Sequence, residues 1–320
     1  MRVYLRTILR DMQSNTPLYW AGVVMWIDFF LCLMLMTIDH RQITGVNAWL
    51  KPAKFAISTA ITNLSLSWIA GRLVDWPRTR AWASLLFAVS TVVDVAIIDL
   101  QAARGTTSHF NMATPFDRAG YITMGVFIGI TLVSMSALTF ALFRQRMAPA
   151  ACAWALRLGL FVSLLGASSG GLMVPPTQAQ LKSPDRFRIG AHTVGAPDGG
   201  PGLPFLNWST SHGDLRIAHF LGLHAMQAIP LGAWWLLRRK RLLELQQVQI
   251  VWLSAGAYFS LVALLAWQAV RGQALLRPDG ATLLVAFIII AFTCVGSLLI
   301  LVPSLQIALE DWVRILEVRS

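Results

Sequence analysis

Residues 281–308 read ATLLVAFIIIAFTCVGSLLILVPSLQIA, a continuous stretch without a charged side chain. An α-helix needs about 20 mostly apolar residues to cross the hydrocarbon core of a membrane. Because the apolar residues are continuous and do not alternate with polar ones, a transmembrane β-strand is excluded. This stretch therefore predicts a transmembrane helix.

The composition of the whole chain agrees with that prediction. Of its 320 residues, 56% are hydrophobic and only 13% are charged, against about 25% charged in ordinary soluble domains. A soluble fold of this length cannot cover so much apolar surface with so few charges, and disorder, collagen and coiled coil are excluded as well. Seven further segments are long and apolar enough to span, near residues 18–38, 53–74, 80–101, 119–143, 151–174, 215–237 and 247–270. We therefore expect an all-α integral membrane protein, with about eight transmembrane helices in one bundle and a single domain over residues 1–320.

The distribution of Lys and Arg predicts the orientation. More of them fall in the connections on the N-terminal side of the membrane, and the run Arg238-Arg239-Lys240-Arg241 lies there too, so the positive-inside rule puts both termini in the cytoplasm. A short amphipathic helix is expected over residues 2–12 on the inner surface. The long connection 175–213 then lies outside, where its Gly, Pro and aromatic residues suggest an ordered lid.

The net charge of +11 fits basic residues that flank spans and contact anionic lipid headgroups. Membrane lipids are therefore expected partners, and nothing in the sequence indicates nucleic acid. The three cysteines all fall within spans and form no CxxC pair, so a disulfide framework is not expected.

Residues 212–227, HGDLRIAHFLGLHAMQ, carry the strongest functional signal. Asp214 is suited to cap the helix that follows. Arg216, His219, His224 and Gln227 share one face of that helix and are expected to line a cavity or hold a cofactor, because polar groups on a span avoid lipid.

A metal site at these histidines needs ligands from other segments. His219 and His224 are five residues apart, a poor spacing for chelation from one helix. The candidate metal ligands are therefore His219 and His224 together with His109 or His40 from elsewhere. The alternative for each histidine is an ordinary interior hydrogen bond.

The third span places Ser90, Thr91, Asp94 and Gln101 on one face, with Arg104 at its edge. A carboxylate within the apolar region costs about 2.5–3.5 kcal/mol, so Asp94 is expected to face the bundle and to have a partner. That partner is expected to be Arg104 or Arg216, in a functional site or in a structural ion pair. The candidate catalytic residues are Asp94, His109 and Arg216.

Lys51 and Lys54 lie at the outer end of the second span. They are expected to form a rim that binds an anion such as a propionate, phosphate or carboxylate, or else to extend toward lipid phosphates. The candidate cofactor-binding residues are His219, His224, Gln227, Arg104, Lys51 and Lys54.

Two structural expectations concern the spans themselves. Gly166 and Gly170 have the spacing that lets helices pack closely. Asp28 and Arg157 are charged residues within spans, and they are expected to pair with each other.

The strings NAWLKPAKF (47–55), QAARGTTSHFN (101–111) and GDLRIAHFLGLHAMQ (213–227) resemble a family of multi-pass bacterial inner-membrane proteins with no known activity. That resemblance implies about eight helices and a location in the bacterial inner membrane. In layout alone the chain is similar to haem A synthase, since Gly170-Gly171, the 175–213 connection and His219 follow in the order of that family. The spans at 53–74, 119–143 and 281–308 contain no histidine, so the paired-helix ligation of that family is not reproduced.

These observations favour a membrane redox protein that binds haem or a transition metal near the periplasmic face and acts on a quinone or another lipid-soluble substrate. Two alternatives stay open. One is a metal-dependent lipid hydrolase or transferase, and the other is a proton-coupled transporter of an amphipathic anion. Whether the protein is an enzyme is left open by the sequence.

Overall fold

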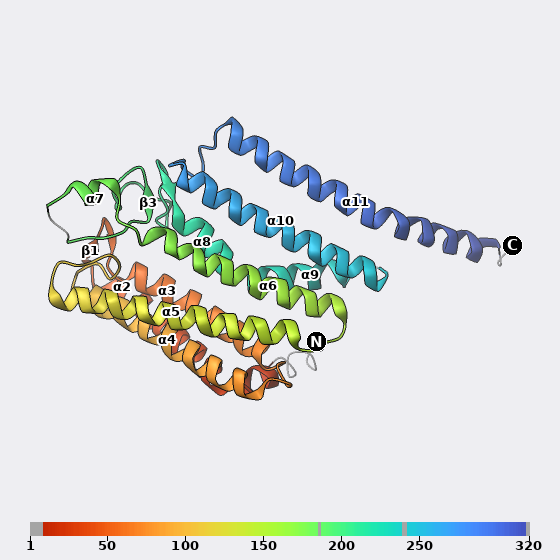
Figure 1. Ribbon diagram of the computed structural model, residues 1–320, viewed down its shortest axis with the longest axis horizontal. Coiled ribbons are helices and arrows are strands. Elements are labelled where there is room, and N and C mark those ends of the chain that lie inside the picture. The colour runs from red at the N-terminus through yellow and green to blue at the C-terminus, as the bar shows by residue number, and fades with distance from the viewer. Residues whose placement is uncertain (1–8, 185–186, 239–241, 318–320) are drawn as a thin grey trace.

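The computed structural model describes residues 9–184, 187–238 and 242–317, and the chain there is almost entirely helical (Figure 1). Within these residues, six segments are long and apolar enough to cross a membrane. They are α2 (Thr16–Ile38), α4 (Pro77–Ala103), α5 (Pro115–Arg144), the segment Ala150–Lys182 that begins with α6 (Ala150–Ser168), α10 (Glu244–Val270) and α11 (Gly280–Glu317). A bent pair, α8 (Leu215–Leu223) and α9 (Ala225–Leu237), makes a seventh if it counts as one span. The prediction of an all-α, multi-pass membrane protein is confirmed.

Helix α3 (Leu50–Ala70) has the length of a span but no stretch apolar enough to count among these segments. Its polar residues face neighbouring helices and avoid lipid: Asn63 is fully buried and donates a hydrogen bond from Nδ2 to Thr91 Oγ1 of α4 at 3.0 Å. The same Nδ2 group donates to Thr59 O at 3.0 Å, while Asn63 Oδ1 has no hydrogen-bond partner among the described residues. A polar helix face that packs against other helices is kept away from lipid.

The helices pack in two groups. Helices α2, α3, α4 and α5 contact one another, as do α6, α8, α9 and α10. The two groups meet where α5 packs on α6, and α11 packs on α10 at the edge of the bundle (Figure 1).

Close packing holds α6 against the bent pair. A Cβ added to Gly166 would lie 2.2 Å from the backbone carbon of Gly222 in α8, which agrees with the small-residue spacing. At the bend, Ser163 Oγ donates to Leu223 O and accepts from Met226 N, both at 2.7 Å. This serine therefore satisfies backbone groups that the break between α8 and α9 leaves without helical partners.

Most of the non-helical chain gathers at one end of the bundle, which we call the loop end (Figure 1). It holds the hairpin of β1 (Gln42–Ile43) and β2 (Val46–Asn47), the short helices η1 (Ser169–Met173) and α7 (Gln178–Lys182), and the pair of β3 (Thr193–Val194) with β4 (Gly213–Asp214). Bridges between Asn111 and Arg188 and between Gly202 and Ser209 add further order. The long connection is thus folded onto the bundle.

The expected pair of Asp28 and Arg157 does not form. Asp28 lies beside Cys32 and Asp99, with their ligand atoms within 4.8 Å of one another. Arg157 instead donates to backbone oxygens near the end of α5, those of Leu142 at 3.1 Å and Gln145 at 2.7 Å. The prediction was wrong because α2 and α6 belong to different helix groups.

Two other expectations fall largely outside the described residues. Of the amphipathic helix expected over 2–12, only the part from residue 9 is described, and it is helical. Of the basic run at 238–241, only Arg238 is described, at the end of α9.

Candidate functional site

A cavity of about 1580 Å³ opens at the loop end and extends between the two helix groups. Its walls come from α3, α4, α5, α6, η1 and α8 and from the three connections at that end. The sequence candidates Lys51, Lys54, Asp94, His109, Arg216, His219 and His224 all line it. Segments far apart in the sequence therefore meet at one site.

The two lysines project from the first turns of α3. Lys51 Nζ lies 3.1 Å from His109 Nδ1, and Lys54 Nζ donates to Leu206 O at 2.9 Å. These contacts direct the ammonium groups into the bundle and toward the loop end. The two lysines, which the sequence analysis expected at the outer end of the helix, therefore form part of the cavity wall.

Arg216 is held in place by the cap of its own helix. Asp214 lies just before α8 and accepts from Arg216 N at 3.0 Å, as the sequence predicts for an N-cap. The same carboxylate accepts from Arg216 Nε at 2.9 Å and from Nη2 at 2.6 Å, and Nη2 also donates to Asn207 O at 2.5 Å. A bidentate pair of this kind fixes the orientation of the guanidinium.

His192 and Asp198 form a second pair that sequence reasoning missed. His192 Nδ1 donates to Asp198 Oδ2 at 2.7 Å, and Asp198 Oδ1 accepts from the backbone amides of His192 and Thr193 at 3.0 and 2.9 Å. Both side chains line the cavity. The available signal was a His and an Asp six residues apart, with Gly195 and Pro197 between them.

The electrostatics of this pair follow from burial and hydrogen bonds. Burial lowers the pKa of His192, although the hydrogen bond to Asp198 acts in the opposite direction. Burial alone would raise the pKa of Asp198, but the hydrogen bond from His192 and those from backbone amides hold it well below its usual range. Asp198 is therefore an ionised, hydrogen-bonded support for a neutral imidazole.

The other histidines of the cavity differ in which ring nitrogen is free. His219 Nδ1 donates to Gly166 O at 2.9 Å, which leaves Nε2 with a lone pair, because a carbonyl can only accept. His109 accepts at Nδ1 from the Lys51 ammonium, so its proton lies on Nε2. Burial, and then the positive charge of Lys51, hold the pKa of His109 well below its usual range. His224 Nε2 lies 2.9 Å from Ser58 Oγ.

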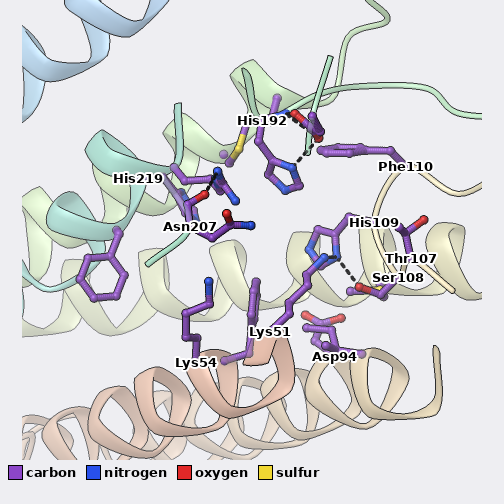
Figure 2. A pocket seen from close by; sticks show the side chains of 18 of the residues that line it. Lys51, Lys54, Asp94, Thr107, Ser108, His109, Phe110, His192, Asn207 and His219 are labelled. Atoms are coloured by element: carbon purple, nitrogen blue, oxygen red, sulfur yellow. Dashed lines mark hydrogen bonds and ion pairs between the residues drawn. The ribbon is translucent and has the colours of Figure 1, made fainter. Parts of the chain in front are cut away.

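The close view shows how these groups converge (Figure 2). His109 and His192 approach from two different connections, and their ring centres are 6.3 Å apart. His219 lies on the opposite side of the space, and the two lysines enter from α3. The centre of the cavity is therefore surrounded by basic side chains.

Three sequence candidates lie elsewhere. Arg104 pairs with Asp117 at 2.5 Å and also donates a hydrogen bond to Gln101. It therefore links α4 to α5 and does not line the cavity. His40 is exposed and Gln227 lies beyond the cavity, and neither residue lines it. Helical periodicity put Gln227 on one face with Arg216 and His219, but the 54° bend between α8 and α9 separates them. His40 lies in the connection after α2.

In the described part of the chain, the histidines do not bring three potential metal ligands close enough to bind one ion. Among the described residues, the one group of three potential ligands whose atoms lie within 4.8 Å of one another is Asp28, Cys32 and Asp99. The basic side chains around the histidines also oppose a bare cation by charge repulsion.

Comparisons of this chain with protein-family models, curated proteins and solved structures return no match. The function is therefore argued from the chemistry of the cavity.

Proposed function

We propose that this protein binds an amphipathic anion in the outer half of a bacterial inner membrane. In this proposal α3 is the eighth span beside the six long helices and the bent pair, and both termini are cytoplasmic. The loop end then faces the periplasm. Reporter fusions test the topology: a phosphatase that needs the periplasm should be active when inserted near residue 199 and inactive after residue 320.

The observation that supports this proposal is the polarity gradient within one cavity. Lys51, Lys54 and Arg216 line its loop end, while Phe87, Ile128 and Leu132 line its deeper part. A charged head fits the first group, because charge-assisted hydrogen bonds recognise carboxylate and phosphate. An apolar chain fits the second group by burial of its surface.

Some residues of the cavity wall also have exposed surface, which supports entry of a lipid-soluble ligand from the membrane. Ile61 of α3 and Ile122 and Ile128 of α5 line the cavity and are exposed as well. These residues lie on α3 and α5, and in this proposal the cavity opens toward the hydrocarbon between these two helices. A ligand can therefore enter from the membrane without first crossing water.

The direct test is binding to the protein in lipid nanodiscs. Octadecanoate should bind, and its methyl ester, which has the same chain without the charge, should bind at least tenfold more weakly because hydrogen bonds to charged groups contribute about 1.5–3 kcal/mol. Lys51→Gln should remove most of that difference. Lys182→Gln is the matched control, since Lys182 is exposed on α7 and does not line the cavity. Equal binding of acid and ester, or no binding of either, would refute the proposal.

A haem- or metal-dependent redox protein acting on a quinone is the second candidate. It is favoured by His192 and His219, whose Nδ1 atoms donate to Asp198 and to Gly166 O. Metal-ligating histidines typically have this second hydrogen bond, which orients the ring and leaves Nε2 free. Visible spectra of the purified protein, oxidised and then reduced with dithionite, test for haem. Elemental analysis of the same sample tests for a metal.

A further inference from the structure

Asp94 lies in the wall of the cavity, and no residue in the described part of the chain bonds to it. Its side chain is on α4, and the residue is only 7% exposed. Among the described residues it makes no hydrogen bond, and its Oδ1 atom is buried without a partner. Figure 2 shows it facing the space into which Lys51 also points. A buried carboxyl group with no hydrogen-bond partner is costly, and a donor on a bound ligand would offset that cost.

The expected partners of Asp94 are already engaged. Arg104 binds Asp117 at 2.5 Å, and Arg216 binds Asp214 at 2.6 Å. Thr91, one turn away on α4, donates to its own helix backbone and accepts from Asn63. The cavity is the side from which a donor can reach Asp94.

A second polar atom in the deep part of the cavity has no partner either. Thr131 of α5 lines the cavity, and its Oγ1 atom is buried without a hydrogen bond among the described residues. Ser58, nearer the loop end, is satisfied by His224 at 2.9 Å. Unsatisfied polar atoms thus remain deep in the cavity, below the histidines.

The depth of Asp94 can be worked out from the helices. The hydrogen bond between Asn63 and Thr91 puts these two residues at one level of the antiparallel helices α3 and α4. Lys51 is twelve residues nearer the loop end than Asn63, and Asp94 is three residues nearer it than Thr91. The remaining nine residues correspond to about 13 Å along the helix axes at 1.5 Å per residue.

We propose that Asp94 recognises a hydrogen-bond donor in the chain of the bound amphiphile, about 13 Å from its anionic head. This inference rests on the proposed function, because it takes the head to be bound at Lys51. The ligand class is an anionic amphiphile with a hydroxyl or amino group along its chain. A plain acyl chain leaves the carboxylate without a donor.

The test compares two fatty acids in nanodiscs. In extended 12-hydroxyoctadecanoate the hydroxyl is at about the required distance from the carboxylate, and octadecanoate lacks it. The wild-type protein should bind the hydroxy acid about tenfold more tightly, as expected for one hydrogen bond to a charged group. Asp94→Leu should abolish this preference while octadecanoate still binds.

The controls separate recognition from folding. Asp99→Asn changes a carboxylate on the same helix that lies beside Asp28 and Cys32 and does not line the cavity, so it should keep the tenfold preference. Asp94→Asn, which keeps the shape of the side chain, should reduce the preference if Asp94→Leu does not fold. Equal affinity of the wild type for the two acids would overturn this inference and leave the proposed function standing. Failure to bind either acid would overturn both.

Discussion

Substitution of Gly166 by Ala should separate α6 from α8 and disturb the cavity. The new Cβ would lie 2.2 Å from Gly222 C and 2.6 Å from Leu223 N. These are backbone atoms, so no side chain can move aside. To restore an ordinary contact of about 3.4 Å, the helices must move apart by about 1.2 Å.

That movement also breaks a hydrogen bond of the site. His219 Nδ1 donates to Gly166 O at 2.9 Å, and a shift of this size takes the two atoms beyond hydrogen-bond distance. Overpacking against backbone costs up to about 3 kcal/mol, and the lost bond costs about 0.5–1.5 kcal/mol. The higher helix propensity of Ala returns about 1 kcal/mol, so the net loss is about 3 kcal/mol.

The assay is thermal unfolding of the purified protein, followed by binding of octadecanoate. A loss of that size lowers Tm by roughly 6–12 °C, extrapolating from domains of 150–250 residues, and affinity should fall because His219 moves. Gly171→Ala is the matched control, because a Cβ there meets no atom within 4 Å. If Gly166→Ala melts within 2 °C of that control, the packing argument is refuted.

Three further predictions concern stability. Asp214→Ala should cost about 2–4 kcal/mol, because it removes both the N-cap of α8 and the partner of Arg216; Asp214→Asn keeps a capping side chain and should recover at least 1 kcal/mol of this in thermal unfolding. Ser163→Ala leaves two backbone groups unsatisfied at the break near His224 and should cost about 1–3 kcal/mol; a Tm equal to that of the wild type would show that the serine does not support the break. The low pKa of His109 means that only the unfolded chain takes up its proton as the pH falls below about 6.5, so stability should decrease toward acid by up to about 1.4 kcal/mol per pH unit. His109→Gln should make the dependence of Tm on pH less steep between about 6.5 and 5, with part of the slope remaining because the pKa of His192 is lowered as well; an unchanged slope would contradict the assignment.

The segments of the bundle could be predicted well because apolar length is a local property of the chain. Most helices begin and end within a few residues of the predicted spans, and the Asp214 cap was found from its position before an apolar helix. Three spans differ: α6 gives way to η1 at residue 169, the span predicted over 215–237 is broken at His224 by a bend of 54°, and α11 continues to Glu317. A helix also forms where the second span was predicted, although α3 is not apolar enough to count among the candidate spans. Its polar residues point inward, and this cannot be seen from mean hydropathy.

The candidate site could be predicted in part. The sequence pointed to Lys51, Lys54, His109 and His219, and the structure brings all of them to one cavity. It could not pair them, because helical periodicity gives the face of a side chain but not the helix that packs against that face. For this reason Arg104 was assigned to the site, although it binds Asp117 at the junction of α4 and α5.

By itself, the sequence determined that this is a helical membrane protein and that its polar residues gather at one end. Both follow from the cost of placing polar groups in hydrocarbon, which acts on each segment separately. Only the tertiary structure decided that Asp198 supports His192 and that Asp94 has no hydrogen-bond partner among the described residues. These facts depend on how the long connection folds back and on which helices come into contact, and both are set by packing between distant parts of the chain, such as that of Gly166 against Gly222.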